Sequence, residues 1–362
     1  MRSSDFAPLR LAETGRCERT LSIMAAMAAG IDASIREDAL PTVSVVIPTR
    51  NRRASLERAL AGFRADGALR EVIVVDDHSD DDTLAWLATE VPGWPELKVL
   101  RTSGLGPSAA RAAGVAQASG DVVLFLDDDE VPMQGLASAH ARHHREREDL
   151  VVCGYYPIVV PSRPSAVLRV LARWYDEGID FVAANPDSGL FRLWGGNFSM
   201  RRKDLARVPL AVAEFEGLKA HEDQEFGLRC LKAGFGYVLD RDLRAEHFYT
   251  RSLKQFRADG RQSGHCTVLI HWLHGDLVGP VPSEVFESQR AVLLRFLRLT
   301  DRAVFYRLAT SALSGLVLAA DALRIDKIGE SCVRLLHRVE RRRGVIERTA
   351  WLESRPESPG ID

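Results

Sequence analysis

The chain has 362 residues, with 48 Lys and Arg against 50 Asp and Glu, so its formal net charge is −2. This balance excludes a nucleic-acid-binding protein held by bulk positive charge. Apolar residues make up 46% of the chain and charged residues 27%, which is ordinary for a globular protein and excludes disordered and fibrous classes. The length predicts about two domains.

Two further features concern the cellular compartment. The longest nearly charge-free apolar stretch near the C-terminus covers 13 residues, from Leu308 to Ala320. Because about 20 are needed to cross a bilayer, no transmembrane helix is predicted. The five cysteines are an odd number and lie at least 36 positions apart, which excludes a CxxC metal site and a dense disulfide framework. Charges interrupt any N-terminal secretory signal, so we expect a cytoplasmic protein.

The predicted elements alternate in chain order. From Thr42 onward, short apolar runs alternate with amphipathic stretches, the pattern of βαβ units on a mostly parallel sheet. Strands are predicted at 43–47, 71–75, 98–100 and 121–126, and helices at 55–63, 83–88 and 108–118. Shorter runs between about 150 and 250 indicate further strands of mixed direction. From Pro282 to about Arg343 the pattern is helical, with one apolar stripe.

These patterns divide the chain into four segments. They are an N-terminal extension (1–41), expected to pack as a helix or stay mobile, an α/β domain (42–262), a C-terminal helical region (263–345) and a tail (346–362) that is frayed after Trp351. Basic residues flank the apolar stripe of the helical region. That stripe is suited to a homodimer interface or to peripheral contact with the inner face of a membrane, and both alternatives stay open.

Acidic residues follow two of the predicted strands. One strand ends in Asp76 and Asp77, and another ends in the run Asp127–Glu130. Because the carboxyl ends of parallel strands meet at one edge, these carboxylates repel one another unless a cation compensates. A hard divalent cation such as Mg²⁺ or Mn²⁺, held by carboxylate and phosphate oxygens, is the natural partner. The alternative is a pair of solvated turns. Neither GxGxxG nor GxxxxGK[ST] occurs, so the common phosphate-binding loops are excluded.

Several segments together resemble the family 2 glycosyltransferases. The segments are VSVVIPTRN (43–51), VVDDHS (74–79), FLDDD (125–129), WGGNFSMRR (194–202) and HEDQEFGLR (221–229). They follow the order and spacing of that family over about residues 42–260. The resemblance implies a GT-A fold, which is a Rossmann-like α/β fold for nucleotide-diphospho-sugar transfer. Its sheet is mostly parallel, and the C-terminal helices extend it.

The resemblance also implies roles for individual residues. Asp77 meets the base of a nucleotide-sugar donor, and Asp129 of the DxD motif holds Mn²⁺ or Mg²⁺, with His247 completing the metal shell. The implied donor-binding residues are Pro48, Thr49, Asn51, Asp77, Arg111, Asp127 and Asp128. At Ala112 the sequence departs from the Arg-Asn pair usual in the family.

On the acceptor side, the resemblance makes Asp223 of the ED motif the catalytic base, beside Glu222. The alternative for these two is to complement the positive end of a helix that runs to Lys232. Trp194, Gly195, Gly196 and Asn197 form either an acceptor platform or a buried indole beside a tight turn.

Other polar groups are interpreted as solvated. His140, His143 and His144 share a helix face with arginines, which argues against a metal there, and His271 and His274 are expected at the surface. The basic face from Arg251 to Arg261 is either solvated or able to close over a diphosphate or to contact anionic lipid.

The sequence therefore predicts an inverting, metal-dependent glycosyltransferase. It moves one sugar from a nucleoside-diphosphate sugar, with UDP favoured, to a small-molecule, glycan or peptide acceptor. Two alternatives are a nucleotide-sugar-binding scaffold without catalysis and a sugar nucleotidyltransferase. The released product separates them, because sugar transfer releases nucleoside diphosphate, nucleotidyl transfer releases pyrophosphate and a scaffold releases neither.

Overall fold

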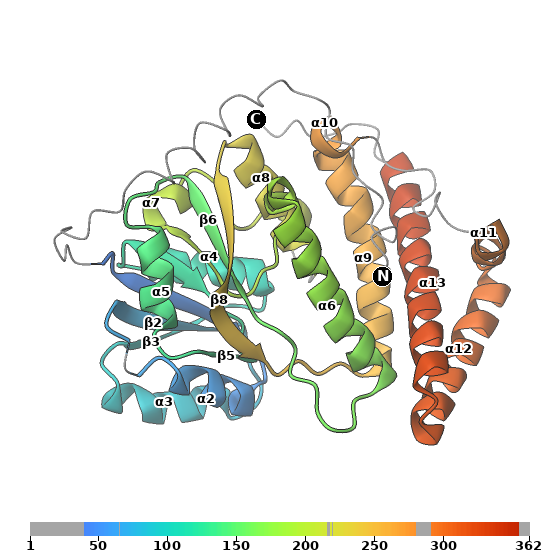
Figure 1. The fold of residues 1–362 in the computed structure, drawn as a ribbon, viewed down its shortest axis with the longest axis horizontal. Helices are drawn as coiled ribbons and strands as arrows, with labels where there is room; N and C mark the ends of the chain where they lie inside the picture. Colours follow the sequence, from blue (N-terminus) through green and yellow to red (C-terminus); the bar gives the residue numbers. More distant parts are fainter. Residues whose placement is uncertain (1–39, 65, 216–217, 219, 280–290, 355–362) are drawn as a thin grey trace.

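The computed structural model describes residues 40–64, 66–215, 218, 220–279 and 291–354. A central sheet carries helices on both faces, and a layer of long C-terminal helices stands beside it (Figure 1). The helix expected in the N-terminal extension lies outside the described residues. The predicted tail does not begin at 346, because the last helix continues to Glu353.

The sheet has eight strands in the order β3-β2-β1-β4-β7-β6-β8-β5. The strands are β1 (Val43–Thr49), β2 (Leu69–Asp76), β3 (Leu97–Arg101), β4 (Val122–Phe125), β5 (Glu130–Pro132), β6 (Leu150–Tyr155), β7 (Phe198–Arg201) and β8 (Gly236–His247). The first four are mutually parallel. β7 runs antiparallel to β4 and β6, and β8 runs parallel to β6 but antiparallel to β5. The predicted mostly parallel sheet with mixed later strands is confirmed.

The helices connect and cover these strands. They are α2 (Arg53–Ala61), α3 (Thr83–Glu90), α4 (Pro107–Gln117), α5 (Leu136–His143), α6 (Ala166–Ala184), α7 (Arg202–Leu205), α8 (Glu222–Lys232), α9 (Leu253–Leu273), α10 (Gly275–Val278), α11 (Ala291–Leu299), α12 (Ala303–Leu323) and α13 (Asp326–Glu353). Short 3-10 turns lie at Val91–Gly93, Pro186–Ser188, Leu190–Arg192 and Ala213–Phe215.

The core explains why the parallel half forms as predicted. Val45 and Ile47 of β1 face one apolar cluster with α2, α3, α5 and α6, whereas Val46 faces a second cluster with α4 and α8. A strand buried on both faces reads as a continuous apolar run. Helix α4 lies close to β1 because Gly114 leaves room, since a Cβ there would lie 2.4 Å from Cγ1 of Val46.

Helices α9 and α13 lie side by side (Figure 1), and glycines permit their close approach. A Cβ on Gly344 would lie 1.9 Å from the carbonyl oxygen of Arg261. Part of the basic face of α9 is exposed, as at Lys254, and part of it forms ion pairs with α13. Nε of Arg257 donates to Glu340 at 2.6 Å, and Arg261 pairs with Glu347. α9 is continuous through the predicted boundary at 262/263, so the helical layer begins with α9.

Helix α12 lies on the outer side of α13, at the end of the molecule farthest from the sheet (Figure 1). It has 21 residues and is long and apolar enough, by length and composition alone, to cross a membrane. The sequence pattern predicted no helix of this kind, so α12 differs from that prediction. It considered the 13 residues from Leu308 to Ala320 but not the apolar turns on either side of them.

Candidate functional site

The acidic residues after β1, β2 and β4 converge at one edge of the sheet, as the parallel pairing requires. Thr49 at the end of β1 donates a hydrogen bond from Oγ1 to Oδ2 of Asp128 at 2.8 Å. Its carbonyl accepts from the backbone N–H of Asp77 at 2.8 Å. The structure therefore brings together the residues that the sequence assigned to donor binding from three separate segments.

Asp77 and Asn51 hold the loops around this edge. Asp77 is buried and accepts from Oγ1 of Thr102 at 2.6 Å and from the N–H of Gly106 at 3.0 Å. Asn51 has a φ of +56°, and its Oδ1 accepts from the N–H of Asp80 at 2.7 Å. Pro48 is half-buried on β1. The loops after β1 and β2 are thus tied into one surface.

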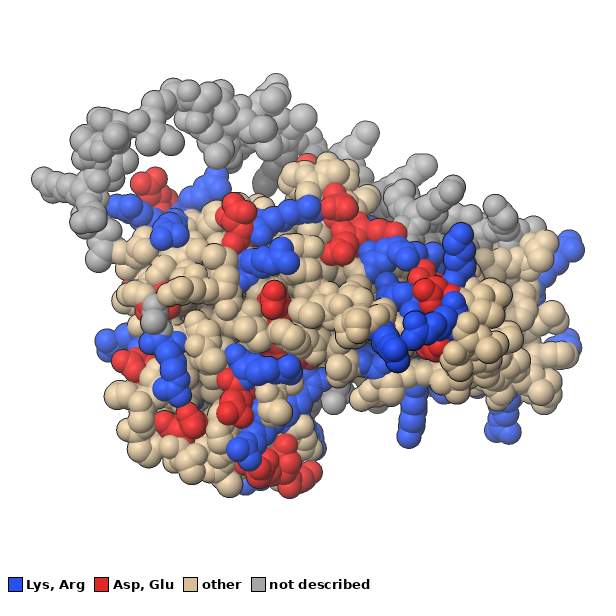
Figure 2. All heavy atoms as spheres, turned by 60° about the horizontal axis from the view of Figure 1, so that its bottom comes forward, with Lys and Arg blue, Asp and Glu red and all other residues tan. Residues whose placement is uncertain are grey.

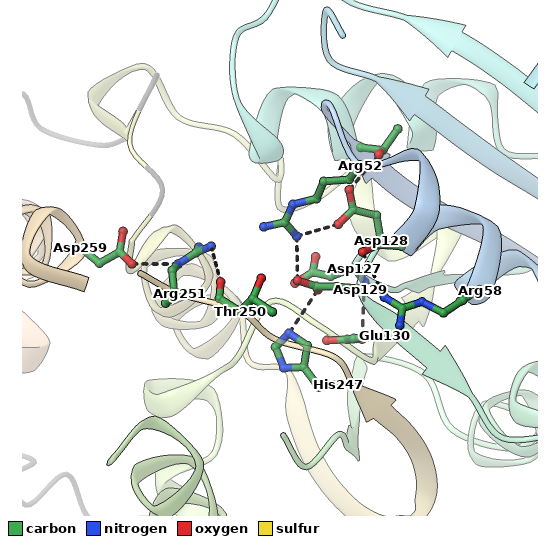
Figure 3. Close-up of polar contacts among 12 residues, drawn as sticks. Arg52, Arg58, Asp127, Asp128, Asp129, Glu130, His247, Thr250, Arg251 and Asp259 are labelled. Atoms are coloured by element: carbon green, nitrogen blue, oxygen red, sulfur yellow. Dashed lines mark hydrogen bonds and ion pairs between the residues drawn. The ribbon is translucent and has the colours of Figure 1, made fainter. Parts of the chain in front are cut away.

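Arg52 was not identified from the sequence, yet it contacts two of the three aspartates (Figure 3). Its Nη1 atom lies 2.9 Å from Oδ1 of Asp128 and 2.7 Å from Oδ2 of Asp129. Burial opposes its charge, but the two carboxylates outweigh burial and raise the pKa of Arg52. Burial raises the pKa of Asp128 to about 6 despite this partner. The signal in the sequence is a cation directly after Asn51, at the end of β1 and close to the strand ends that carry the carboxylates.

Asp129 and His247 meet because of strand pairing. β5 begins directly after Asp129, and Glu130 lies opposite His247 in the antiparallel register with β8. Nε2 of His247 is 3.1 Å from Oδ1 of Asp129, on the side away from Arg52 (Figure 3). Burial tends to raise the pKa of Asp129, but His247 and Arg52 outweigh it and lower that pKa. The predicted pair of metal ligands is in contact.

The donor set at this edge suits an incomplete metal shell. In the described part of the chain no three His, Cys, Asp or Glu side chains form a metal cluster. A carboxylate and an imidazole in contact supply two ligands, and Mg²⁺ or Mn²⁺ commonly takes its remaining ligands from phosphates and water. A divalent cation here would need further ligands from outside the protein, because Arg52 already contacts the other carboxylate oxygen of Asp129.

A pocket of about 560 Å³ opens beside Asp129. Its walls come from the start of α2, from Asp81 and Asp82, and from Phe248 and Thr250. Pockets of about 300–1,000 Å³ are typical of small-ligand sites. The space next to Asp129 is therefore large enough for a small ligand.

Glu130 is a second residue that sequence reasoning did not identify. It is fully buried, burial raises its pKa well above the usual range, and its Oε1 has no hydrogen-bond partner in the described structure. A Cβ on Gly196 would lie 2.0 Å from Oε1 of Glu130. Gly196 is therefore needed to leave room for this carboxyl group. Gly196 itself is buried, so it offers no exposed surface to an acceptor.

Arg111 connects the two acidic motifs. It lies on α4 and is buried, and its Nη2 is 2.6 Å from Oδ1 of Asp127. Its Nη1 is 3.9 Å from Oε1 of Glu222 at the start of α8. Positions 127 and 222 are 95 residues apart in the chain (222 − 127). One guanidinium therefore joins the loop after β4 to the helix that carries Asp223.

Asp223 sits in the first turn of α8, where the helix dipole favours negative charge. Its Oδ2 accepts from the N–H of Gly195 at 2.8 Å, and its Oδ1 accepts from the N–H of Gln224 at 2.8 Å. Burial raises the pKa of Asp223 and of Glu222 above their usual range, and Arg111 limits the rise. The two carboxyls titrate as a pair.

The segment 194–197 divides between two roles. Trp194 is half-buried with its ring edge-on to Tyr175 at 5.8 Å between centroids. Gly195 contacts Asp223 through its N–H. Asn197 is fully buried, and its Nδ2 donates to the carbonyl of Leu243 at 2.8 Å. Because its side chain is buried, Asn197 holds this segment from inside the fold, and its acceptor role stays a prediction.

Three of the histidines that were expected to be solvated are buried instead. His140 and His144 are fully buried, as is His274, whose Nε2 is 3.1 Å from Oε1 of Glu225. His144 donates to Oγ of Ser199, Ser199 donates to Nδ1 of His140, and His140 donates to Oδ1 of Asn197, at 2.8, 2.8 and 2.9 Å. The donor direction follows from the bond of Asn197 to Leu243. This series of hydrogen bonds between uncharged groups supports the segment 194–197, which contacts Asp223 through Gly195.

Part of the chain is similar to known glycosyltransferases. Residues 44–208 match the family model described as glycosyl transferase family 2. The chain is 35% identical over 102 residues to the GalNAc(5)-diNAcBac-PP-undecaprenol beta-1,3-glucosyltransferase of Campylobacter jejuni, covering 27% of this chain and 33% of that protein. It is 44% identical over 99 residues to the undecaprenyl-phosphate 4-deoxy-4-formamido-L-arabinose transferase of Pectobacterium atrosepticum, covering 25% of this chain and 30% of that protein.

The matched segment spans about a third of the length of these relatives. Among solved structures, glucosyl-3-phosphoglycerate synthase from Mycobacterium tuberculosis, in complex with Mn²⁺, uridine diphosphate and glucosyl-3-phosphoglycerate, aligns with a TM-score of 0.46 at 21% identity. That alignment covers 67% of this chain and 82% of the other. Asp223 and His247 lie beyond the segment that the family model matches.

Proposed function

Because residues 44–208 match the family 2 glycosyltransferase model and end their parallel strands in a cluster of carboxylates, we propose that the protein transfers one sugar from a nucleoside-diphosphate sugar to an acceptor hydroxyl with inversion. Uridine diphosphate is the first donor nucleotide to test. The observation that carries the proposal is the Arg111 bridge, which places the acidic loop after β4 against Glu222, next to Asp223. Donor-binding and base-like groups thereby share one site.

Asp223 acts as the general base in this proposal. It takes the proton of the acceptor hydroxyl while that oxygen bonds to the anomeric carbon and the bond from that carbon to the diphosphate breaks. Its raised pKa suits a base that works near neutral pH. The N–H of Gly195 and the N–H of Gln224 hold the carboxylate in place. Attack from the side opposite the leaving group inverts the anomeric centre.

The loop after β4 holds the donor. Asp129 and His247 would hold Mn²⁺ or Mg²⁺ together with the donor diphosphate, and Asp127, with a side chain 32% exposed, is the most accessible of the three aspartates. A divalent cation supplies Lewis-acid stabilisation of the charge on the leaving diphosphate. Arg52 balances Asp128 and Asp129 from the opposite side.

The first test separates donor binding from turnover. Calorimetric titration with UDP, GDP, dTDP and CMP, each with Mn²⁺ and with chelator, identifies the nucleotide. Asp129→Asn should weaken the Mn²⁺-dependent part of that binding. Equal affinity of the wild-type protein with Mn²⁺ and with chelator contradicts the metal proposal.

The second test addresses the base. Asp223→Asn should bind the donor as the wild type does but lower the turnover by about 10²–10⁴-fold, because it removes a base and little binding energy. Asp180→Asn is the matched control, since Asp180 is an exposed carboxylate that pairs with Arg241. Turnover of Asp223→Asn within a few fold of this control contradicts the role of Asp223.

The product separates the remaining alternatives. Release of nucleoside diphosphate supports sugar transfer, release of pyrophosphate supports a nucleotidyltransferase, and donor binding without release supports a scaffold. The names of the two relatives include undecaprenol and undecaprenyl phosphate. An acceptor screen therefore begins with polyprenyl phosphates and continues with glycans, peptides and small hydroxyl compounds.

A further inference from the structure

Helix α12 exposes an apolar face, here called the outer face. Of the large apolar side chains that are exposed among the described residues, ten lie between Val292 and Ile328. Those on α12 are Val304, Phe305, Leu308, Leu316, Leu318 and Leu323, with exposed fractions between 43% and 70%. The opposite side of α12, with Leu313, Val317 and Ala320, is buried. The helix is therefore apolar on both sides.

Charge is absent from the outer face. Between Arg307 and Asp321, α12 carries no charged residue. Asp321 points inward, where its Oδ1 accepts from the N–H of Ala166 at 2.8 Å and lies 3.4 Å from Nη2 of Arg169. A surface helix normally turns charged residues to water, and a contiguous exposed apolar patch of a few hundred Å² is often a functional surface.

Basic residues border the outer face at both ends. Arg302 and Arg307 lie near the start of α12, and Arg324 and Lys327 lie just beyond its end, all exposed. Ile325, between Arg324 and Lys327, and Ile328, directly after Lys327, are exposed apolar residues at the same end. This end of the molecule is mostly tan in Figure 2, with Lys and Arg side chains projecting at its margin. An apolar strip with a basic border is complementary to acyl chains beneath anionic headgroups.

The dimensions of the outer face argue against a second copy. With 21 residues α12 is about 31 Å long, and a strip about 10 Å wide then covers about 300 Å². A stable protein interface needs about 800 Å² from each partner. Packing also argues against a helix that crosses the bilayer, because α12 lies along α13 and Asp321 holds it to the start of α6.

We propose that α12 lies in the plane of a membrane surface, with its outer face among the acyl chains and the bordering arginines and lysine against anionic lipid headgroups. A bilayer fits because it accepts a single exposed helix face without a complementary protein surface. This inference is independent of the glycosyl transfer proposed above, because it rests on α12 and its neighbours alone.

The test is co-sedimentation of the full chain with two kinds of vesicle, phosphatidylcholine alone and phosphatidylcholine mixed with phosphatidylglycerol, without substrate. The wild type should sediment with the mixed vesicles and be released by high salt and by alkaline carbonate. Leu308→Glu with Leu316→Glu should weaken binding about tenfold or more, since two charges enter the acyl region. Arg302→Gln with Arg307→Gln should remove most of the preference for anionic lipid.

The control is Val91→Glu with Val160→Glu, which adds the same charges at exposed apolar positions away from the outer face. It should bind as the wild type does. All substituted side chains are exposed, so thermal unfolding should show that each variant folds. Three outcomes overturn the proposal. They are wild-type protein that stays in the supernatant with both vesicles, retention after carbonate, which indicates a spanning helix, and a dimer in light scattering that Leu308→Glu with Leu316→Glu dissociates.

Discussion

Replacing Arg111 by methionine should destabilise the protein in a pH-dependent way. Arg111 is buried and lies against Asp127 at 2.6 Å and Glu222 at 3.9 Å. Methionine fills much of the same volume but removes the only cation between these two carboxylates that the structure describes. Glu222 and Asp223 then share a partly buried site in which less positive charge balances their negative charge.

The size of the effect follows from the distance to Glu222. At 3.9 Å and an effective dielectric constant of about 20, the attraction between two unit charges is about 4 kcal/mol, equivalent to about three pKa units. Removing one partner of a buried ion pair typically costs about 3–5 kcal/mol. We expect a loss of about 4 kcal/mol in the free energy of unfolding at about pH 8.

The pH dependence has a definite sign. Burial already raises the pKa of Glu222 and Asp223 above the values of the unfolded chain. The stability linked to these groups is therefore full below the unfolded pKa and is lost as pH rises through the folded pKa. Without Arg111 the folded pKa values rise further and this loss grows. The deficit of Arg111→Met should shrink to about 1–2 kcal/mol at about pH 5, where the pair is protonated.

The assay is urea unfolding at the two pH values, followed by tryptophan fluorescence. Lys203→Met is the matched control, because Lys203 pairs with Glu148 at an exposed position and should change stability by less than about 1 kcal/mol at either pH. Arg111→Lys should recover part of the loss. An equal deficit of Arg111→Met at both pH values refutes the assignment of Arg111 as the cation that compensates the pair.

Two other predictions test structural claims. Burial lowers the pKa of His140 to about 4, from an unfolded value of 6.5, so the neutral ring stabilises the fold above pH 6.5 and that stability is lost as pH falls toward 4. His140→Gln should reduce the loss of unfolding free energy over this range by about 3 kcal/mol in acid titration, and an unchanged titration contradicts burial of the ring. Gly344→Ala should lower stability by about 1–3 kcal/mol because α9 and α13 must separate. Gly315→Ala, where a Cβ meets nothing within 4 Å, should raise the thermal midpoint; equal effects of the two refute the close crossing.

Local pattern was enough to predict the parallel half of the sheet. The nearly continuous apolar runs 43–47 and 71–75 are found as β1 and β2, because burial on both faces favours apolar side chains along the strand. Their two buried polar residues, Ser44 and Glu71, hydrogen-bond to each other. The closeness of the acidic residues at the ends of β2 and β4 then follows from parallel pairing alone. The order of the motifs along the chain likewise predicted the family model that residues 44–208 match.

Burial of the polar side chains depended on elements far away in the chain. His140 lies on α5 and His274 lies between α9 and α10, in local sequences that look solvated, and the two side chains are buried against Ser199 and Glu225. The same holds for Arg257, whose partner Glu340 is 83 residues away. Side-chain periodicity describes one element and says nothing about the element that covers it.

The sequence by itself determined which residues carry charge at the strand ends and which helices have apolar stripes. Only the tertiary structure decided that Arg52 balances Asp128 and Asp129, and that Arg111 joins the loop after β4 to α8. It also decided that α12 turns an apolar side outward. The physical reason is that composition and spacing determine local conformation, whereas ion pairing, burial and exposure depend on contacts between segments that chain entropy keeps apart until the fold forms.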